Sequence, residues 1–147
     1  MAEIVSSETI EGVHVVTPDV YGDDRGFFVE TYRREWIPEG SREMVQANRG
    51  DRQSGCIVGL HYHLHQADYW YVPFGTVRVV LHDLRSGSPT EGATQLTDLQ
   101  GNEHRGIYIP PGVLTGSELL LTQQSPTSWI TTTTPRTNSA WRGTIQR

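Results

Sequence analysis

Three histidines within five residues, His61, His63 and His65, are the densest group of chemically versatile side chains in the sequence. Alternate residues of a β-strand point to the same face, so a strand here projects all three imidazoles to one side. Leu60, Tyr62 and Leu64, which alternate with them, then supply an opposite packed face. An imidazole titrates near neutral pH, so it can serve as a general acid, a general base or a metal ligand. The alternative is a row of polar side chains on a solvent-exposed face.

An acidic residue follows this cluster at a regular distance. Four residues separate His63 from Asp68, and six more separate Asp68 from Gly75. This spacing resembles the first sequence motif of the cupin superfamily, with Asp in the position of the usual Glu. Two imidazoles and one carboxylate are a ligand set for Fe²⁺, Mn²⁺, Ni²⁺ or Zn²⁺. A metal site of His61, His63 and Asp68 is therefore one hypothesis.

The second cupin motif is only partly present. It normally ends in a histidine, but here Pro110-Pro111-Gly112 leads to Thr115. The fourth ligand of a cupin metal site is therefore missing. We expect a site without a cofactor, and a divalent metal ion stays open as the alternative.

Strand-like segments separated by Gly and Pro turns recur along the chain. Only one segment, over residues 33–40, has helix signals. It is expected to be a short turn, because Pro38 and Gly40 stop it early. Many short strands at this spacing are typical of an all-β sandwich or barrel. We expect a single all-β domain over residues 1–147. Its strands are predicted at residues 12–17, 26–32, 57–65, 69–72, 76–84, 106–109, 117–122 and 129–134.

Composition limits the partners and the compartment. Lys and Arg number 12 against 17 Asp and Glu, giving a net charge of −5, which disfavours a nucleic-acid-binding surface. The single cysteine excludes an internal disulfide and favours a reducing compartment. The first residues show no signal peptide, and no stretch reaches the ~18 nonpolar residues of a membrane helix. We expect a cytoplasmic protein that contacts neither nucleic acid nor membrane.

A longer series of motifs resembles the dTDP-4-dehydrorhamnose 3,5-epimerase family, in order from about residue 13 to about residue 120. The resemblance implies a cupin double-stranded β-helix, or jelly roll. It also implies a homodimer with exchanged strands. The matching segments are Asp24-Arg25-Gly26-Phe27-Phe28-Val29-Glu30-Thr31-Tyr32, Val45-Gln46-Ala47-Asn48, Gly59-Leu60-His61-Tyr62, Asp83-Leu84-Arg85-Ser86-Gly87-Ser88-Pro89-Thr90 and Ile109-Pro110-Pro111-Gly112.

The resemblance also implies roles for individual side chains. His61 matches the family's general base. Several other residues match positions that line the family's substrate pocket, namely Arg25, Phe28, Glu30, Gln46 and Asn48.

Four positions depart from the family pattern. Val58 replaces a pyrophosphate-binding Arg, Asp68 an active-site Lys, Thr115 a His, and Trp129 the Tyr that acts as an acid. The first two changes make the pocket more negative by about three charge units, which disfavours binding of a pyrophosphate. We also expect the family's C-terminal extension, whose Asp is partnered with the base, to be missing.

Together these residues predict an isomerase-like or epimerase-like enzyme acting on a small molecule in sugar or secondary-metabolite biosynthesis. His61 is the expected base next to a carbonyl. His63 and Tyr69 are the further candidate catalytic residues. Tyr71, Thr115 and Trp129 are expected to line an aromatic cavity that binds the substrate.

Three other functions stay open at this point. The first is a cupin cyclase or tailoring enzyme that acts on a natural product without a nucleotide. The second is a metal-dependent cupin that uses His61, His63 and Asp68. The third is a non-catalytic cupin that only binds a small molecule.

Overall fold

The structure is a computed structural model that describes residues 1–120 and 127–134. Its strands form two antiparallel sheets and a separate two-stranded hairpin, and the only helical segments in these residues are two single turns of 3-10 helix. The expected all-β class is confirmed. The strands are β1 (Glu3–Ser6), β2 (His14–Thr17), β3 (Val20–Asp23), β4 (Gly26–Val29), β5 (Gln46–Arg52), β6 (Ile57–His61), β7 (Asp68–Phe74), β8 (Thr76–Asp83), β9 (Thr94–Gln100), β10 (Gly106–Ile109), β11 (Val113–Leu119) and β12 (Thr127–Thr133), and the 3-10 turns are η1 (Arg34–Trp36) and η2 (Gly101–Glu103).

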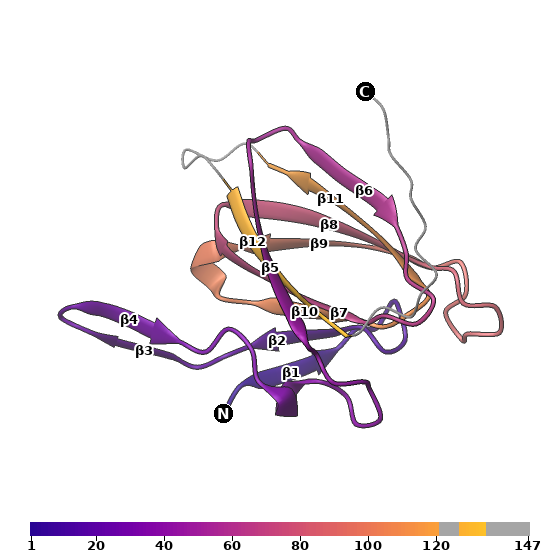
Figure 1. Cartoon of the computed structure of the whole chain (residues 1–147), viewed down its shortest axis with the longest axis horizontal. Coiled ribbons are helices and arrows are strands. Elements are labelled where there is room, and N and C mark those ends of the chain that lie inside the picture. The colour runs from indigo at the N-terminus through magenta and orange to yellow at the C-terminus, as the bar shows by residue number, and fades with distance from the viewer. Residues whose placement is uncertain (121–126, 135–147) are drawn as a thin grey trace.

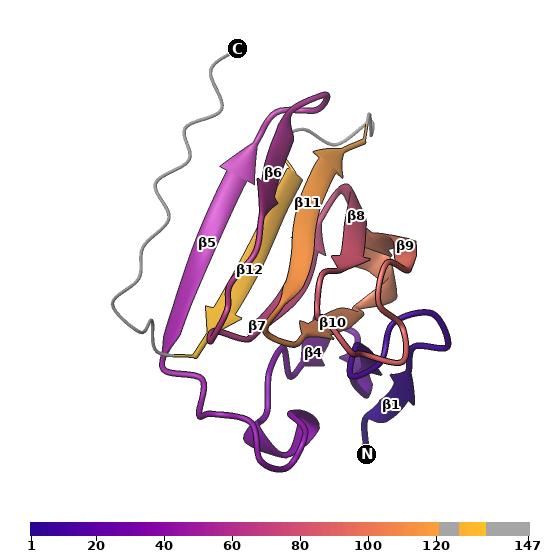
Figure 2. The same ribbon diagram turned by 90° about the vertical axis from the view of Figure 1, so that its right-hand side faces the viewer.

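The two sheets face each other as the layers of a jelly roll (Figures 1 and 2). The larger sheet has the order β1-β2-β10-β7-β12-β5, and the smaller has the order β6-β11-β8-β9. Strand β8 shows why these layers form, since its burial alternates along its length and buries Val77, Val79 and Leu81 against the opposite sheet. Trp70 and Val72 of β7 meet them from the larger sheet, so the space between the sheets is the main core.

A second core covers the outer face of the larger sheet. Tyr69 and Tyr71 alternate with Trp70 on β7, and they pack with Trp36 and Ile37 from the η1 region. Strands β7 and β10 are therefore buried on both faces, and every residue from Asp68 to Val72 is buried. Such strands give no hydrophobic alternation in the sequence, which hides the direction of each side chain.

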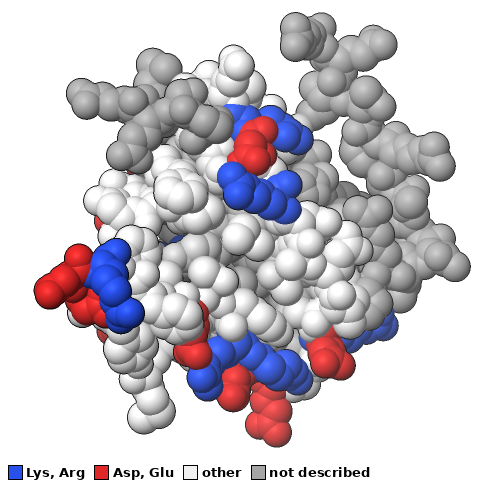
Figure 3. Space-filling model, turned by 60° about the vertical axis from the view of Figure 1, so that its left-hand side comes forward, with Lys and Arg blue, Asp and Glu red and all other residues white. Residues whose placement is uncertain are grey.

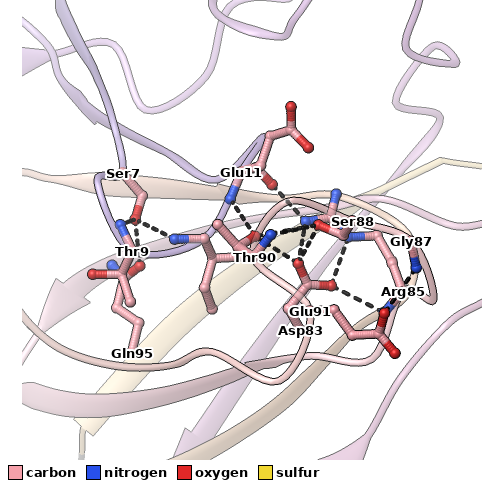
Figure 4. Close-up of polar contacts among 11 residues, drawn as sticks. Ser7, Thr9, Glu11, Asp83, Arg85, Gly87, Ser88, Thr90, Glu91 and Gln95 are labelled. Carbon is pink, nitrogen blue, oxygen red and sulfur yellow. Dashed lines mark hydrogen bonds and ion pairs between the residues drawn. The ribbon is translucent and has the colours of Figure 1, made fainter.

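One loop is held by a buried carboxylate. Asp83, at the end of β8, accepts hydrogen bonds from the backbone nitrogen and guanidinium of Arg85 and from the hydroxyls of Ser88 and Thr90 (Figure 4). The same guanidinium donates to the backbone oxygen of Glu11, 2.7 Å away. This network ties the loop after β8 to the N-terminal part of the chain.

Several predicted strands have different limits in the structure. The segment 57–65 is strand only as far as His61, because the chain then crosses from the smaller sheet to the larger one, where β7 begins. The expected packed face of Leu60 and Leu64 is wrong: these side chains are 54% and 62% exposed, and Leu64 lies in the loop beyond the end of β6. The segment 117–122 begins four residues earlier, as β11, and Thr122 lies outside the described residues.

Four strands were not predicted: β1, β3, β5 and β9. Each lies at a sheet edge or in the separate hairpin, where polar residues are common and the nonpolar pattern is weak. For β5, whose sequence is Gln-Ala-Asn-Arg-Gly-Asp-Arg, no hydrophobic signal exists at all. No helix among the described residues is long and nonpolar enough to span a bilayer.

Candidate active site

Two of the three clustered histidines meet the acidic residue between the sheets. His61 ends β6 of the smaller sheet, Asp68 begins β7 of the larger sheet, and His63 lies in the loop that joins them. One ligand atom from each of the three side chains lies within 4.8 Å of the other two. The sequence spacing therefore predicted the right group, although the crossing between sheets, and not a continuous strand, brings it together.

Contacts within this cluster are close and polar. His63 Nε2 lies 3.8 Å from Asp68 Oδ2, and the ring centroids of His61 and His63 are 5.3 Å apart in an edge-on arrangement. Gln66 Nε2 donates to Asp68 Oδ1 over 2.9 Å. The carboxylate is nearly buried, with 5% of its side chain exposed, whereas that of His63 is 31% exposed. The cluster thus has a buried acid on one side and a route to solvent on the other.

Thr115 fixes the ring of His61. These residues are opposite each other in the β6–β11 ladder, and Thr115 Oγ1 lies 3.2 Å from His61 Nε2 and 3.2 Å from the His61 carbonyl oxygen. One hydroxyl proton cannot serve both contacts. Both are satisfied when the hydroxyl donates to the carbonyl and protonated Nε2 donates to the hydroxyl oxygen, which leaves Nδ1 as the basic nitrogen.

Glycine makes this pairing possible. The β6–β11 register shifts next to Thr115, and at that point Gly59 has φ +122. A Cβ atom at Gly59 would lie 2.8 Å from the backbone of Gly116 and 2.9 Å from the Thr115 carbonyl oxygen. The two backbones can approach this closely only where residue 59 has no side chain.

Burial sets the protonation state of His61. Desolvation lowers the pKa of its imidazole, the neighbouring His63 lowers it further, and Asp68 partly opposes both effects. A lowered pKa favours the neutral ring, which has a lone pair at neutral pH. His61 is therefore suited to accept a proton.

Strands β5 and β12 supply the facing wall. Thr133 pairs with both Asp68 and Gln46, and Thr131 pairs with Asn48, so Gln46 and Asn48 share the face of Asp68. Gln46 Nε2 donates to Asn48 Oδ1 over 2.9 Å. The register therefore places both amides on the face that Asp68 shares, and their role in binding a substrate stays a prediction.

Trp129 stands on the same wall. It pairs with Gly50 in β5, where a Cβ atom would lie 2.9 Å from the indole ring, so the ring fills the space above that glycine. It also packs against the main core, and the guanidinium of Arg52 lies 5.6 Å from its ring centroid. The resemblance puts the family's acid Tyr near Trp129, whose side chain is a flat, largely nonpolar ring.

Tyr69 and Tyr71 are not brought to the cluster. Both point to the outer core, on the face of β7 opposite Asp68. Tyr69 is 1% exposed and packs against Tyr32 and Trp36, and burial strongly raises the pKa of its phenol. The phenol of Tyr71 instead contacts His104 Nδ1 at 3.2 Å.

His65 also lies apart from the other two histidines. It is exposed and lines a depression of about 450 Å³ on the outer side of the loop, together with Leu64, Tyr108 and Arg42. The expectation that all three imidazoles share one face is therefore wrong, because the loop turns after His61.

Arg25, Phe28 and Glu30 lie on or beside the β3–β4 hairpin, which projects from the body of the molecule on the side away from β6 (Figure 1). Arg25 pairs with Asp23 and Glu30 with Arg33, and Phe28 is 68% exposed. The structure of one chain does not bring these residues to His61. Such local pairs are common on the surface, and Figure 3 shows basic side chains lying beside acidic ones on one face.

Gln66 was missed by the sequence analysis. Its buried side chain orients the carboxylate of Asp68, and its own Oε1 has no partner among the described residues. The available signal was its position two residues before Asp68, which places both side chains on one face of an extended segment.

Comparison with known proteins shows the family of this chain. The family model of dTDP-4-dehydrorhamnose 3,5-epimerase matches residues 7–139. The chain is 38% identical over 112 residues to the spore coat polysaccharide biosynthesis protein SpsL of Bacillus subtilis, covering 76% of this chain and 72% of that one. It is 36% identical over 108 residues to dTDP-4-dehydrorhamnose 3,5-epimerase of Neisseria gonorrhoeae, covering 71% of this chain but 33% of the relative.

Solved structures agree with the sequence comparison. A crystal structure of dTDP-6-deoxy-D-glucose-3,5-epimerase RmlC from Legionella pneumophila, in complex with dTDP-4-keto-L-rhamnose, superposes with a TM-score of 0.83. The two are 30% identical, and the match covers 94% of this chain and 74% of that one. The jelly-roll fold predicted from the sequence is thereby confirmed. The chain belongs to the dTDP-4-dehydrorhamnose 3,5-epimerase family.

Proposed function

We propose that the protein is an epimerase that inverts a carbon next to the ketone of a 4-keto-6-deoxy sugar in sugar biosynthesis, with His61 as the general base. The observation that carries this proposal is the position of the His61 imidazole, which Thr115 holds between the two sheets at 3.2 Å from its hydroxyl, in surroundings that lower its pKa. Membership of the epimerase family supports the reaction class. The 4-keto-6-deoxy sugar of the dTDP-4-keto-L-rhamnose bound in the Legionella complex supplies the class of sugar.

The reaction begins with removal of a proton. The His61 nitrogen takes the proton from the carbon next to the ketone, and the electron pair of the broken C–H bond moves into the carbonyl to form an enolate. When the carbon regains a proton on its opposite face, the electron pair returns to form the new C–H bond and the configuration is inverted. No electrons leave the substrate, so no redox partner is required.

Water is the acid for the second step in this proposal. The rings of His61 and His63 are in edge contact, so in this proposal both lie on the same side of the substrate. The facing wall carries Trp129, whose indole is not an acid at neutral pH. The Tyr69 phenol belongs to the outer core. A proton taken from solvent leaves a clear isotopic record in heavy water.

A second copy of the chain is the partner in this proposal. The β3–β4 hairpin carries nonpolar side chains that the described residues leave largely exposed, with Phe27 63%, Phe28 68% and Tyr21 61% exposed, although the Phe27 ring also contacts His104. In a homodimer with exchanged elements, this hairpin would bring Arg25, Phe28 and Glu30 to the partner's site. Light scattering on the eluting protein measures this state directly. The cytoplasmic location stays a prediction.

The test is solvent deuterium incorporation into dTDP-4-keto-6-deoxyglucose, followed by NMR. We expect the wild type to incorporate deuterium next to the ketone, and His61→Asn to lose at least about 100-fold of that rate. His82→Asn is the matched control. His82 lies on β8, contacts Thr94 on the outer face of the sheet and is outside the cluster. Equal rates in wild type and His61→Asn would overturn the role of His61, and no incorporation by the wild type would overturn the activity.

Nucleotide recognition needs a separate measurement. Val58 and Asp68 stand where the family has cationic side chains, so the free sugar and the dTDP-linked sugar are compared as substrates. Stabilisation of the protein by dTDP in thermal unfolding would show that the nucleotide itself binds.

A further inference from the structure

The geometry of His61, His63 and Asp68 points to a binding site for a divalent transition-metal ion. The three candidate ligand atoms all lie within 4.8 Å of one another, and His63 Nε2 and Asp68 Oδ2 are 3.8 Å apart. Nitrogen and oxygen ligands about 2.1 Å from a metal, at right angles to each other, lie about 3 Å apart. On binding an ion the ligand atoms would have to move closer together, by up to about 1.8 Å, through rotation of the imidazole rings.

Asp68 has the surroundings of a ligand carboxylate. Its side chain is 5% exposed, and the amide of Gln66 donates to Oδ1, which orients the carboxylate so that Oδ2 faces His63. A hydrogen bond from a second residue commonly holds a metal-binding carboxylate in this way. Burying a carboxylate beside two imidazoles is costly unless their charges and hydrogen bonds are used, and a bound cation uses them.

The backbone places the three donors independently. His61 is fixed by the β6–β11 ladder and Asp68 by β7, while the His63 carbonyl accepts a 2.7 Å hydrogen bond from the Gly112 backbone. The side chain of His63 is 31% exposed, which gives an ion a route from solvent. The Thr115 hydroxyl, 3.2 Å from His61 Nε2, adds an oxygen at the edge of the site.

The donor set selects the class of ion. Two imidazole nitrogens and one carboxylate oxygen favour Fe²⁺, Co²⁺, Ni²⁺ or Zn²⁺ over Mg²⁺ and Ca²⁺, which prefer all-oxygen ligands. Three protein ligands leave coordination positions for water or for a substrate oxygen.

Metal binding and base catalysis compete for one imidazole. A His61 nitrogen that holds a metal ion has no lone pair for a substrate proton, so the two states of the site exclude each other. The metal site does not depend on the proposed epimerase activity. If that activity is present, however, the metal ion inhibits it.

Titration with Co²⁺ tests the site, because binding of cobalt by nitrogen ligands can be followed through its visible absorption. The wild type, His63→Gln and His65→Gln are compared, with excess Mg²⁺ present throughout. His65 is the matched control, because it lies in the same loop but outside the cluster. We expect one Co²⁺ per chain in the wild type and in His65→Gln, and an affinity about 100-fold weaker in His63→Gln. His61→Asn is tested in the same way as a second ligand variant. Thermal unfolding midpoints without metal show whether each variant is folded.

The outcomes separate the two proposals. Absence of one-to-one binding by the wild type, or equal affinity in the wild type, His63→Gln and His61→Asn, overturns the metal site. Deuterium incorporation is then measured with Zn²⁺ and again after EDTA. Suppression by Zn²⁺ and recovery with EDTA are expected. Full incorporation by the Zn²⁺-saturated enzyme overturns the competition at His61. Cobalt binding without any incorporation under either condition leaves the metal site in place and removes the epimerase.

Discussion

Two carboxylates, Asp83 and Asp68, are almost equally buried, at 1% and 4% exposed, yet their surroundings differ in kind. Asp83 accepts hydrogen bonds from a guanidinium, a backbone nitrogen and two hydroxyls (Figure 4). Asp68 lies beside the imidazole of His63 and the amide of Gln66, with His61 next to them.

The difference lies in what the neighbours can do. The guanidinium of Arg85 stays protonated at any ordinary pH, and it also crosslinks the loop to the Glu11 backbone, so the Asp83 network stabilises the fold. Imidazoles exchange protons near neutral pH and bind metal ions, so the neighbours of Asp68 can take part in chemistry. Asp83 lies in a segment that matches the family pattern, whereas Asp68 departs from it, so a match to the family does not by itself mark a residue as functional.

The largest expected effect is on stability, and it compares one substitution in each region. Asp83→Asn removes a buried charge and leaves Arg85 partly unpaired, so we expect a loss of about 3 kcal/mol in the free energy of unfolding. His61→Asn changes a half-buried side chain at a strand end and is expected to cost less than about 1 kcal/mol. Chemical denaturation of both variants measures this.

Activity should change in the opposite order. Folded Asp83→Asn is expected to incorporate deuterium at the wild-type rate, because none of its partners lies in the cluster. An Asp83→Asn protein as stable as the wild type, or a folded one without activity, would contradict the division between the two regions.

The sequence predicted the cluster for a reason that was only half correct. The spacing of His61, His63 and Asp68 correctly indicated a common site, but the expected continuous strand ends at His61. A crossing between two sheets can bring the same residues together, and no local pattern distinguishes a strand from a crossing with alternating residues. The nonpolar Leu64 strengthened the strand prediction, although it is exposed.

The direction of Tyr69 could not be predicted from the sequence. Because side chains alternate along a strand, a strand over residues 69–72 puts Tyr69 and Tyr71 on one face and Trp70 on the other, as the structure has them. Which face borders the space between the sheets depends on the η1 region covering the outer side, a contact between distant segments. The position of the hairpin residues Arg25 and Phe28 is harder still to predict, since any role for them at the site requires a second chain.

The next expected effect is on how the stability contributed by Asp83 depends on pH. Hydrogen bonds from the Arg85 side chain hold the pKa of the Asp83 carboxyl well below its ordinary 3.8, although burial acts in the opposite direction. A lowered folded-state pKa contributes stability above the unfolded-state pKa, and this contribution is lost as the pH falls toward the folded-state value. The stability gap between wild type and Asp83→Asn should therefore narrow between pH 5 and pH 3.

Urea unfolding at both pH values measures this gap. The exposed carboxylates are the same in both proteins, so their titration cancels in the difference. A gap that stays constant or widens as the pH falls would show that Asp83 is not the source of the acid sensitivity.

The smallest effect is a matched pair of hydroxyl deletions. Ser88→Ala removes a 2.7 Å hydrogen bond to Asp83, and Thr115→Val removes the hydroxyl that contacts the ring and carbonyl of His61. Each should lower the free energy of unfolding by about 1–2 kcal/mol, because each breaks a hydrogen bond in a buried setting. Stability alone will therefore not distinguish them. Only Thr115→Val frees the His61 ring and its tautomer, so only this variant should slow deuterium incorporation and shift its pH profile. Equal incorporation by both variants would mean that the hydroxyl of Thr115 holds the sheet together and does not orient the base.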